Sequence, residues 1–160
     1  ILTMEYIMYT IVNMDRKFYA DKLPRKLLDV INRFNETDKK ARSFGTDTVL
    51  HLSEIHLVEF IGDNEKLSVS EIARRNNITK GAVSQTLIRL EGKKLIVKAL
   101  NPENKSQAVV LLTKKGWTAY CEHKKYHENI NRVILSCVQD KSGKDMEAIY
   151  SFLEQLEKLL

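Results

Sequence analysis

The spacing of hydrophobic positions changes several times along the chain, and each change indicates a different element. Between Pro24 and Arg42 the apolar residues recur at helical spacing, which predicts a helix that begins at the proline. An apolar segment over residues 1–20 predicts a separate helix before it. A buried helix is predicted over residues 53–61, with Gly62 as its C-cap glycine.

Two short helices joined by a tight turn come next. Ser68 and Glu71 have the spacing of a capping box, which predicts a short helix that breaks at Asn76. Thr79 is a good N-cap for the following helix. The apolar face of that helix carries Ala82, Val83, Leu87 and Leu90. The pattern therefore predicts a helix-turn-helix.

Two β-prone runs, 95–100 and 108–112, flank turn chemistry and predict a hairpin, the wing of a winged helix-turn-helix. Beyond Thr113, apolar and histidine residues alternate at spacings of three and four over a long helix, and a final helix capped by Ser142 repeats the pattern. The predicted fold is mainly α with a small β-hairpin wing. Its parts are N-terminal dimerisation helices (1–48), the DNA-binding module (49–112) and C-terminal dimerisation helices (113–160).

Composition supports a globular, helix-rich chain of 160 residues, since 43% are hydrophobic and 29% charged. No apolar run approaches the length of a membrane span and the N-terminal segment lacks the order of a signal peptide, so a cytoplasmic protein is expected. Cys121 and Cys137 are expected to be reduced packing residues. No paired nucleophile and base and no glycine-rich phosphate loop are recognisable, so no enzymatic role is expected.

Positive charge is concentrated in one region. Residues 74–105 carry eight Lys or Arg and two Asp or Glu, a net charge of +6, whereas the whole chain carries +5. The region coincides with the helix-turn-helix and the wing, which contact phosphates in such modules, so double-stranded DNA is the predicted partner. A protein-binding winged helix is the alternative, and a salt titration separates the two because phosphate contacts weaken steeply with salt.

Outward-facing residues on the second helix of the motif are the candidates for reading bases. Gln85 can pair with adenine, while Lys80 and Arg89 can contact guanine or phosphate. Wing residues are candidates for phosphate or minor-groove contacts. The full set of predicted DNA-binding residues is Ser68, Thr79, Lys80, Gly81, Ser84, Gln85, Arg89, Lys98, Asn104 and Lys105.

From Pro24 to the C-terminus the chain resembles the MarR transcriptional regulators. The resemblance rests on the order of helices, on SVSEIARRNNITKGAVSQTLIRLEGKKLI, on the wing and on LTKKG leading into the long helix. It implies a homodimer that reads a pseudo-palindromic operator, usually to repress nearby genes. The family's wing usually reads Asp-Pro-x-Asp-Arg-Arg, whereas this chain has Asn101-Pro-Glu-Asn-Lys-Ser, so Lys105 stands in for the arginine.

Histidines add a second candidate site. His123 and His127 lie one helical turn apart, a spacing that lets two imidazoles share a tetrahedral ion, and packing on the helical seam is the alternative. Lys124 stands where a metalloprotease would need its catalytic Glu, which argues against a zinc hydrolase. Resemblance to the zinc-responsive MarR branch implies one zinc site per subunit, with ligands His56, His123 and His127 and a carboxylate at Asp38.

Zinc bound between the dimerisation helices and the winged module would shift the equilibrium between two shapes of the dimer. It would favour the shape in which the spacing of the recognition helices fits DNA. Two alternatives remain within the same fold. A small organic ligand can occupy the same crevice and release the DNA, with Trp117, Tyr120 and Tyr126 as lining residues. Oxidation of Cys121 or Cys137 can do the same.

Overall fold

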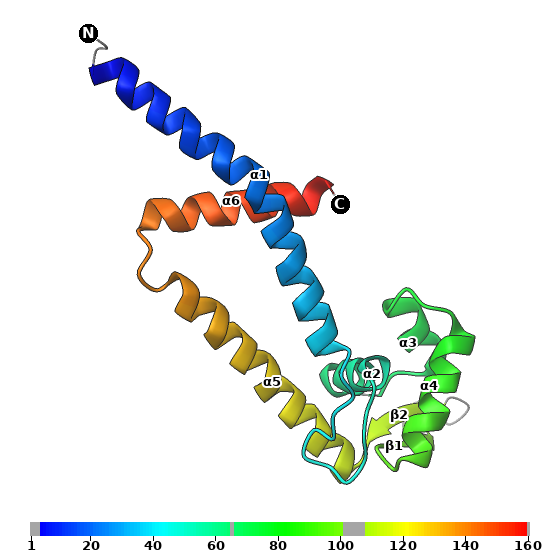
Figure 1. Ribbon diagram of the computed structural model, residues 1–160. Helices are drawn as coiled ribbons and strands as arrows, with labels where there is room; N and C mark the ends of the chain where they lie inside the picture. Colours follow the sequence, from blue (N-terminus) through cyan, green and yellow to red (C-terminus); the bar gives the residue numbers. More distant parts are fainter. Residues whose placement is uncertain (1–3, 65, 101–107, 160) are drawn as a thin grey trace.

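The fold is mainly helical with one antiparallel hairpin, as the sequence predicts (Figure 1). The computed structural model describes residues 4–64, 66–100 and 108–159, and the side chains from residue 15 onward. Its elements are α1 (Met4–Asp38), α2 (Leu52–Asp63), α3 (Val69–Arg75), α4 (Lys80–Gly92), β1 (Ile96–Leu100), β2 (Ala108–Leu112), α5 (Lys114–Val138) and α6 (Gly143–Leu159). Within these described ranges, no helix is long and apolar enough to span a membrane.

α1 is one continuous helix, so the predicted helix start at Pro24 is wrong. The proline lies inside α1. Proline removes one backbone donor and crowds the preceding turn, but residues with good helix propensity such as Lys, Leu and Arg flank it on both sides. In a helix of 35 residues the loss of one hydrogen bond is tolerated because the turns on either side continue to propagate.

The caps of the central module follow the sequence prediction. Glu71 N–H donates to Ser68 Oγ at 3.3 Å and the Glu71 carboxylate accepts from Ser68 N–H at 2.9 Å, which completes the capping box. Thr79 and Thr113 cap α4 and α5 through their hydroxyl oxygens. These contacts satisfy backbone donors that the first turn of a helix leaves free.

Two local predictions need correction. α2 continues past Gly62 and its C-cap is Asn64. Gly62 instead lies against the Tyr120 ring, where an added Cβ would come 2.5 Å from a ring carbon. On α4, Thr86 is buried and Ala82 is exposed, because the Thr86 hydroxyl bonds the Ala82 carbonyl at 3.1 Å and so loses no hydrogen bond on burial.

One hydrophobic core lies inside the winged module. Its most buried members come from α2, α3, α4 and the hairpin, with Leu50, Val58, Ile72, Val83, Leu87, Leu90 and Leu95 fully enclosed. The hairpin pairs Ile96 with Leu112, so that the wing emerges next to the end of α4 and the start of α5. This packing buries one face of α4 and leaves its opposite face exposed.

Gly116, in the first turn of α5, gives a stability prediction. A Cβ on this residue would meet the Leu95 carbonyl oxygen and come within 3.2 Å of Leu112 Cβ. Because a backbone oxygen cannot rotate away, Gly116→Ala is expected to lower the free energy of unfolding by about 1–3 kcal/mol, the usual cost of overpacking. Chemical denaturation measures the change. The control is Gly92→Ala, which meets no atom within 4 Å, and an unchanged stability of Gly116→Ala would contradict the packing.

α1 and α5 extend away from the winged module, and α6 crosses α1 in this view (Figure 1). Their apolar residues are exposed in the single chain: Phe34 is 46% exposed, Ile134 56% and Leu153 49%. α6 has no buried residue among those described, although its sequence is strongly amphipathic. These helices therefore present apolar faces that one chain by itself does not cover.

Candidate nucleic-acid interface and metal centre

The outward face of α4 carries the predicted base-reading residues. Lys80, Gly81, Gln85 and Arg89 are exposed and Ser84 is half-buried. Since Gly81 has no atom within 4 Å of the position of a Cβ, the start of α4 is open for close approach. The structure thus brings the α4 candidates together on one accessible face.

The other predicted DNA-binding residues are Ser68, Thr79, Lys98, Asn104 and Lys105. The Ser68 and Thr79 side chains are engaged as helix caps. Lys98 lies on β1 and pairs with Glu91, with 2.7 Å between Nζ and Oε2. Asn104 and Lys105 lie outside the described residues, as does the rest of the wing tip.

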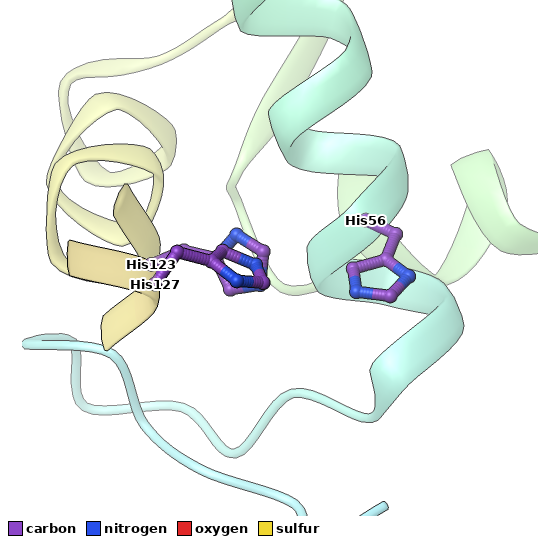
Figure 2. Close-up of side chains that lie close together, drawn as sticks. All are labelled: His56, His123 and His127. Carbon is purple, nitrogen blue, oxygen red and sulfur yellow. The ribbon is translucent and has the colours of Figure 1, made fainter. Parts of the chain in front are cut away.

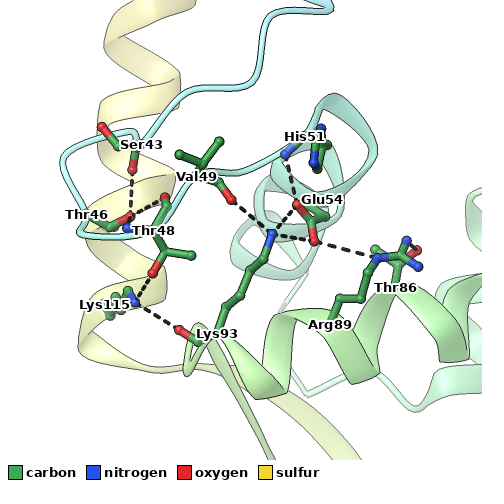
Figure 3. A network of polar contacts seen from close by, with 10 residues as sticks. All are labelled: Ser43, Thr46, Thr48, Val49, His51, Glu54, Thr86, Arg89, Lys93 and Lys115. Atoms are coloured by element: carbon green, nitrogen blue, oxygen red, sulfur yellow. Dashed lines mark hydrogen bonds and ion pairs between the residues drawn. The ribbon is translucent and has the colours of Figure 1, made fainter.

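A buried carboxylate that the sequence did not single out lies behind Arg89. Glu54 on α2 is 1% exposed, and its two oxygens accept from Lys93 Nζ at 2.8 and 2.7 Å (Figure 3). The His51 backbone N–H donates to Glu54 at 2.9 Å, and Arg89 Nε lies 3.6 Å away. Burial alone would raise the pKa of Glu54, but the Lys93 ammonium and the His51 N–H together hold it below its ordinary value.

This network joins α2 to α4. Lys93, just beyond the end of α4, also donates to the Val49 carbonyl at 2.9 Å, and Arg89 donates to Thr86 Oγ1 at 2.9 Å (Figure 3). The Arg89 side chain is half exposed, so it reaches from the buried carboxylate toward the outer face. The contacts of Lys93 and Arg89 with Glu54 therefore tie α2 to the C-terminal part of α4.

Three histidines meet between α2 and α5. His56 projects from α2 toward His123 and His127, which lie one turn apart on α5 (Figure 2). One ligand nitrogen from each lies within 4.8 Å of the others. The ring centroids of His123 and His127 are 4.4 Å apart, and those of His56 and His123 are 5.4 Å apart. The structure thus brings together the three histidines named from the sequence.

His123 is the buried member of the cluster. It is 1% exposed, and its Nδ1 has no hydrogen-bond partner within the described residues. Burial, followed by the neighbouring His127, His56 and Arg42, lowers the pKa of His123 to about 4. The ring is therefore neutral at pH 7, the form that binds a metal ion, even though the Glu59 carboxylate lies 3.5 Å from Nδ1.

Aromatic rings enclose one side of the cluster. Phe44 meets His123 edge to face with centroids 5.2 Å apart. Tyr126 lies beside His127 with centroids 5.7 Å apart, and the Arg42 guanidinium covers Tyr126 at 4.5 Å. This cover limits the access of water to the site, as is usual around protein-bound metal ions.

Asp38 does not join the histidine group. It is the last residue of α1 and is half-buried, and the ligand group within 4.8 Å contains the three histidines without it. A carboxylate that the sequence did not identify, Glu59, is the acidic group beside His123. Its position three residues after His56 on α2 is the signal that marks it, because i and i+3 share a helical face.

The three imidazoles fit zinc better than a harder ion. Neutral imidazole nitrogen suits zinc, whereas magnesium and calcium prefer oxygen ligands. His56, His123 and His127 are the residues that would hold the ion.

The aromatic residues considered as the lining of an organic-ligand site do not all line one hollow. Tyr126 lines an apolar hollow between α1 and α5 together with Phe34 and Ile130. The Tyr120 hydroxyl instead donates to Asp63 at 2.6 Å, and Trp117 lines a separate hollow beside β2. Both cysteines of α5 are free and exposed, so the prediction that they are packing residues is wrong for the single chain, because no other element within the described residues covers either position.

Comparison with known proteins agrees with this geometry. Over 92 residues the chain is 33% identical to the uncharacterized HTH-type transcriptional regulator YhjH of Bacillus subtilis strain 168, covering 58% of this chain and 53% of that protein. The matched segment thus spans about half the length of that relative. The relative is a transcriptional regulator, in agreement with the expectation that the chain is not an enzyme.

Solved structures share the fold over most of the chain. Streptococcus pneumoniae FabT in complex with DNA aligns with a TM-score of 0.68 at 20% identity, covering 88% of this chain and 96% of FabT. Lactococcus lactis ZitR, described as a zinc-responsive MarR family member, aligns with a TM-score of 0.70 at 19% identity, covering 87% of this chain and 97% of ZitR. The family model described as MarR family matches residues 50–105. Over these residues, which include the helix-turn-helix, the chain is similar to the MarR family.

Proposed function

We propose that the chain is a DNA-binding transcriptional repressor that acts as a homodimer on a pseudo-palindromic operator. The observation that carries the proposal is the +6 charge of residues 74–105, the segment that contains α4 with its exposed outer face. Lys80, Gln85 and Arg89 supply the donors and acceptors that base edges and phosphates require. The regulator name of YhjH and the DNA complex of FabT support the same function.

Fluorescence anisotropy with duplex DNA from upstream of the protein's own gene tests DNA binding. Phosphate contacts release counterions, so we expect affinity to fall steeply as salt rises. Lys80→Ala is expected to weaken binding and to reduce the slope of log affinity against log salt by about 1, the contribution of one phosphate contact. Lys144→Ala, an exposed lysine on α6, is the control. A salt-independent affinity would favour the protein-binding alternative.

The homodimer is proposed to form through α1, α5 and α6, whose apolar residues one chain leaves exposed. Leu153→Glu, which places a charge on the apolar face of α6, is expected to shift the protein from dimer to monomer at micromolar concentration in sedimentation velocity. Glu154→Lys changes an exposed charge next to it and is the control. A Leu153→Glu protein that stays dimeric would contradict the assignment of α6 to the interface.

We propose that zinc tunes DNA affinity through His56, His123 and His127. A bound zinc ion would supply a cross-link between imidazoles of two helices. His56 belongs to α2, which also carries Glu54 and its contacts to Lys93 and Arg89 of the α4 region. Fixing α2 against α5 therefore favours one position of α4, and an effector shifts the equilibrium only by its differential affinity for the two positions.

Measuring the anisotropy titration in chelator and again in excess zinc tests this regulation. Tighter binding with zinc is the expected result. DNA affinity that is indifferent to zinc would leave the fold and the DNA-binding role intact and would favour an organic effector. The apolar hollow of Phe34, Tyr126 and Ile130 is the site that supports this second candidate.

A further inference from the structure

We propose that Glu59 is a positioning residue for the metal site: its carboxylate accepts a hydrogen bond from His123 Nδ1–H and so leaves Nε2 of His123 as the ligand atom. The inference rests on the proposed zinc-binding function and deepens it. It assigns a role to a carboxylate that lies beside the histidines without belonging to the group that would hold the ion.

The contact is specific to one ring nitrogen. Glu59 Oε2 lies 3.5 Å from His123 Nδ1, the buried atom that lacks a hydrogen-bond partner within the described residues. A donor that is buried without a partner is costly, so the ring needs an acceptor there. The separation exceeds a normal hydrogen bond by a few tenths of an ångström, and the Glu59 side chain, which is 28% exposed, is not locked by packing.

The position of the proton on the His123 ring decides which nitrogen can bind a metal ion. A neutral imidazole carries one N–H, and whichever nitrogen holds the proton cannot bind a metal ion. Donation from Nδ1 to a carboxylate therefore fixes the tautomer, orients the ring and makes Nε2 the more basic donor atom. His123 needs such support more than its neighbours do, because it is the one buried histidine of the three.

Helix geometry explains why Glu59 reaches His123 rather than another ligand. His56 and Glu59 lie three residues apart on α2 and share the face that packs against α5. One face of α2 thus supplies both a ligand and the carboxylate that supports the ligand opposite. Glu59 is not assigned as a ligand itself, since the ligand atoms that lie within 4.8 Å of one another belong to the three histidines and not to a carboxylate.

Zinc affinity, measured by competition with a chromophoric chelator, tests the role. Glu59→Ala is expected to lower the affinity about 10–100-fold, the usual effect of removing an outer-shell partner. Glu59→Gln, which keeps an acceptor oxygen at the same reach, is expected to recover most of that loss. The matched control is Glu128→Gln, which neutralises an exposed carboxylate next to His127 and is expected to leave the affinity unchanged.

A spectroscopic measurement tests the role of Glu59 without relying on zinc affinity. In metal-free protein, long-range ¹⁵N–¹H correlation spectra are expected to show His123 with its proton on Nδ1 in the wild type and with that preference lost in Glu59→Ala. Cobalt substitution is expected to give the same coordination number in both. A cobalt spectrum that reports a lost ligand in Glu59→Ala would overturn the positioning role.

Two different results would overturn the zinc regulation and the role of Glu59. A folded wild-type protein that binds no zinc overturns the zinc regulation proposed above. A wild-type protein that binds zinc, and whose affinity and His123 tautomer both survive Glu59→Ala, overturns the role of Glu59 alone.

Discussion

Replacing His123 and His127 together by alanine is expected to abolish the effect of zinc on DNA affinity and to leave DNA binding in chelator unchanged. Zinc affinity is expected to fall by at least about 100-fold, since loss of an outer-shell group alone reaches that size. Both rings come from α5, so the substitution removes the α5 side of the cross-link and leaves His56 alone on α2. Chelator competition and anisotropy measure the two effects.

His51 provides the matched control for this experiment. It is an exposed histidine at the start of α2 that lies outside the three-histidine group. His51→Ala is therefore expected to keep both zinc affinity and the zinc effect on DNA. If the double variant still responds to zinc as the wild type does, the histidine cluster is not the regulatory site.

Lys93→Met is expected to lower the free energy of unfolding by about 3 kcal/mol, which is typical of removing one partner of a buried ion pair. Glu54 is 1% exposed and would lose the ammonium that bonds both of its oxygens. The expected cost lies at the lower end of such effects because Arg89 Nε remains 3.6 Å from the carboxylate. Urea denaturation monitored by circular dichroism measures the change.

Acidification gives this prediction a second signature. The pKa of Glu54 is lowered in the folded protein, so its ion pair contributes stability above the ordinary pKa of 4.5 and loses that contribution as the pH falls through the folded value. The difference between wild type and Lys93→Met is therefore expected to be largest at neutral pH and to shrink in acid. A difference that stays constant with pH would contradict the pairing.

Lys98→Met is the control for lysine removal. Lys98 pairs with Glu91 at 2.7 Å, but both side chains are more than a third exposed. Exposed pairs contribute about 0–1 kcal/mol, so little change is expected. If Lys93→Met and Lys98→Met lowered the free energy of unfolding equally, the burial of Glu54 would add nothing to the stabilising effect of its ion pair.

Local signals in the sequence predicted most elements correctly. The Ser68–Glu71 capping box and the Thr79 and Thr113 caps act within one helical turn, so their effect does not depend on the rest of the fold. β2 begins and ends where the β-prone run does. The errors arose where structure beyond the local residues decided the outcome. Pro24 lies inside the long helix α1, and Gly62 packs against Tyr120 instead of ending α2.

The candidate metal site was predictable only in part. Spacing on α5 was enough to pair His123 with His127, whereas the inclusion of His56 came from resemblance to a family. Asp38 lies at the end of α1, outside the group, and the position of Glu59 beside His123 depends on how α2 packs against α5. Side-chain contacts between two helices are not encoded in the periodicity of either one.

The sequence by itself determined the order and type of the elements and the location of the basic region, because caps, hydrophobic period and charge act over a few neighbouring residues. Tertiary structure alone decided which distant residues meet. Lys93 reaches Glu54 across 39 residues of chain, and His56 faces His123 from a different helix. Such contacts follow from the packing of the whole core, where burial makes an unpaired charge or a lone imidazole nitrogen costly and so selects its partner.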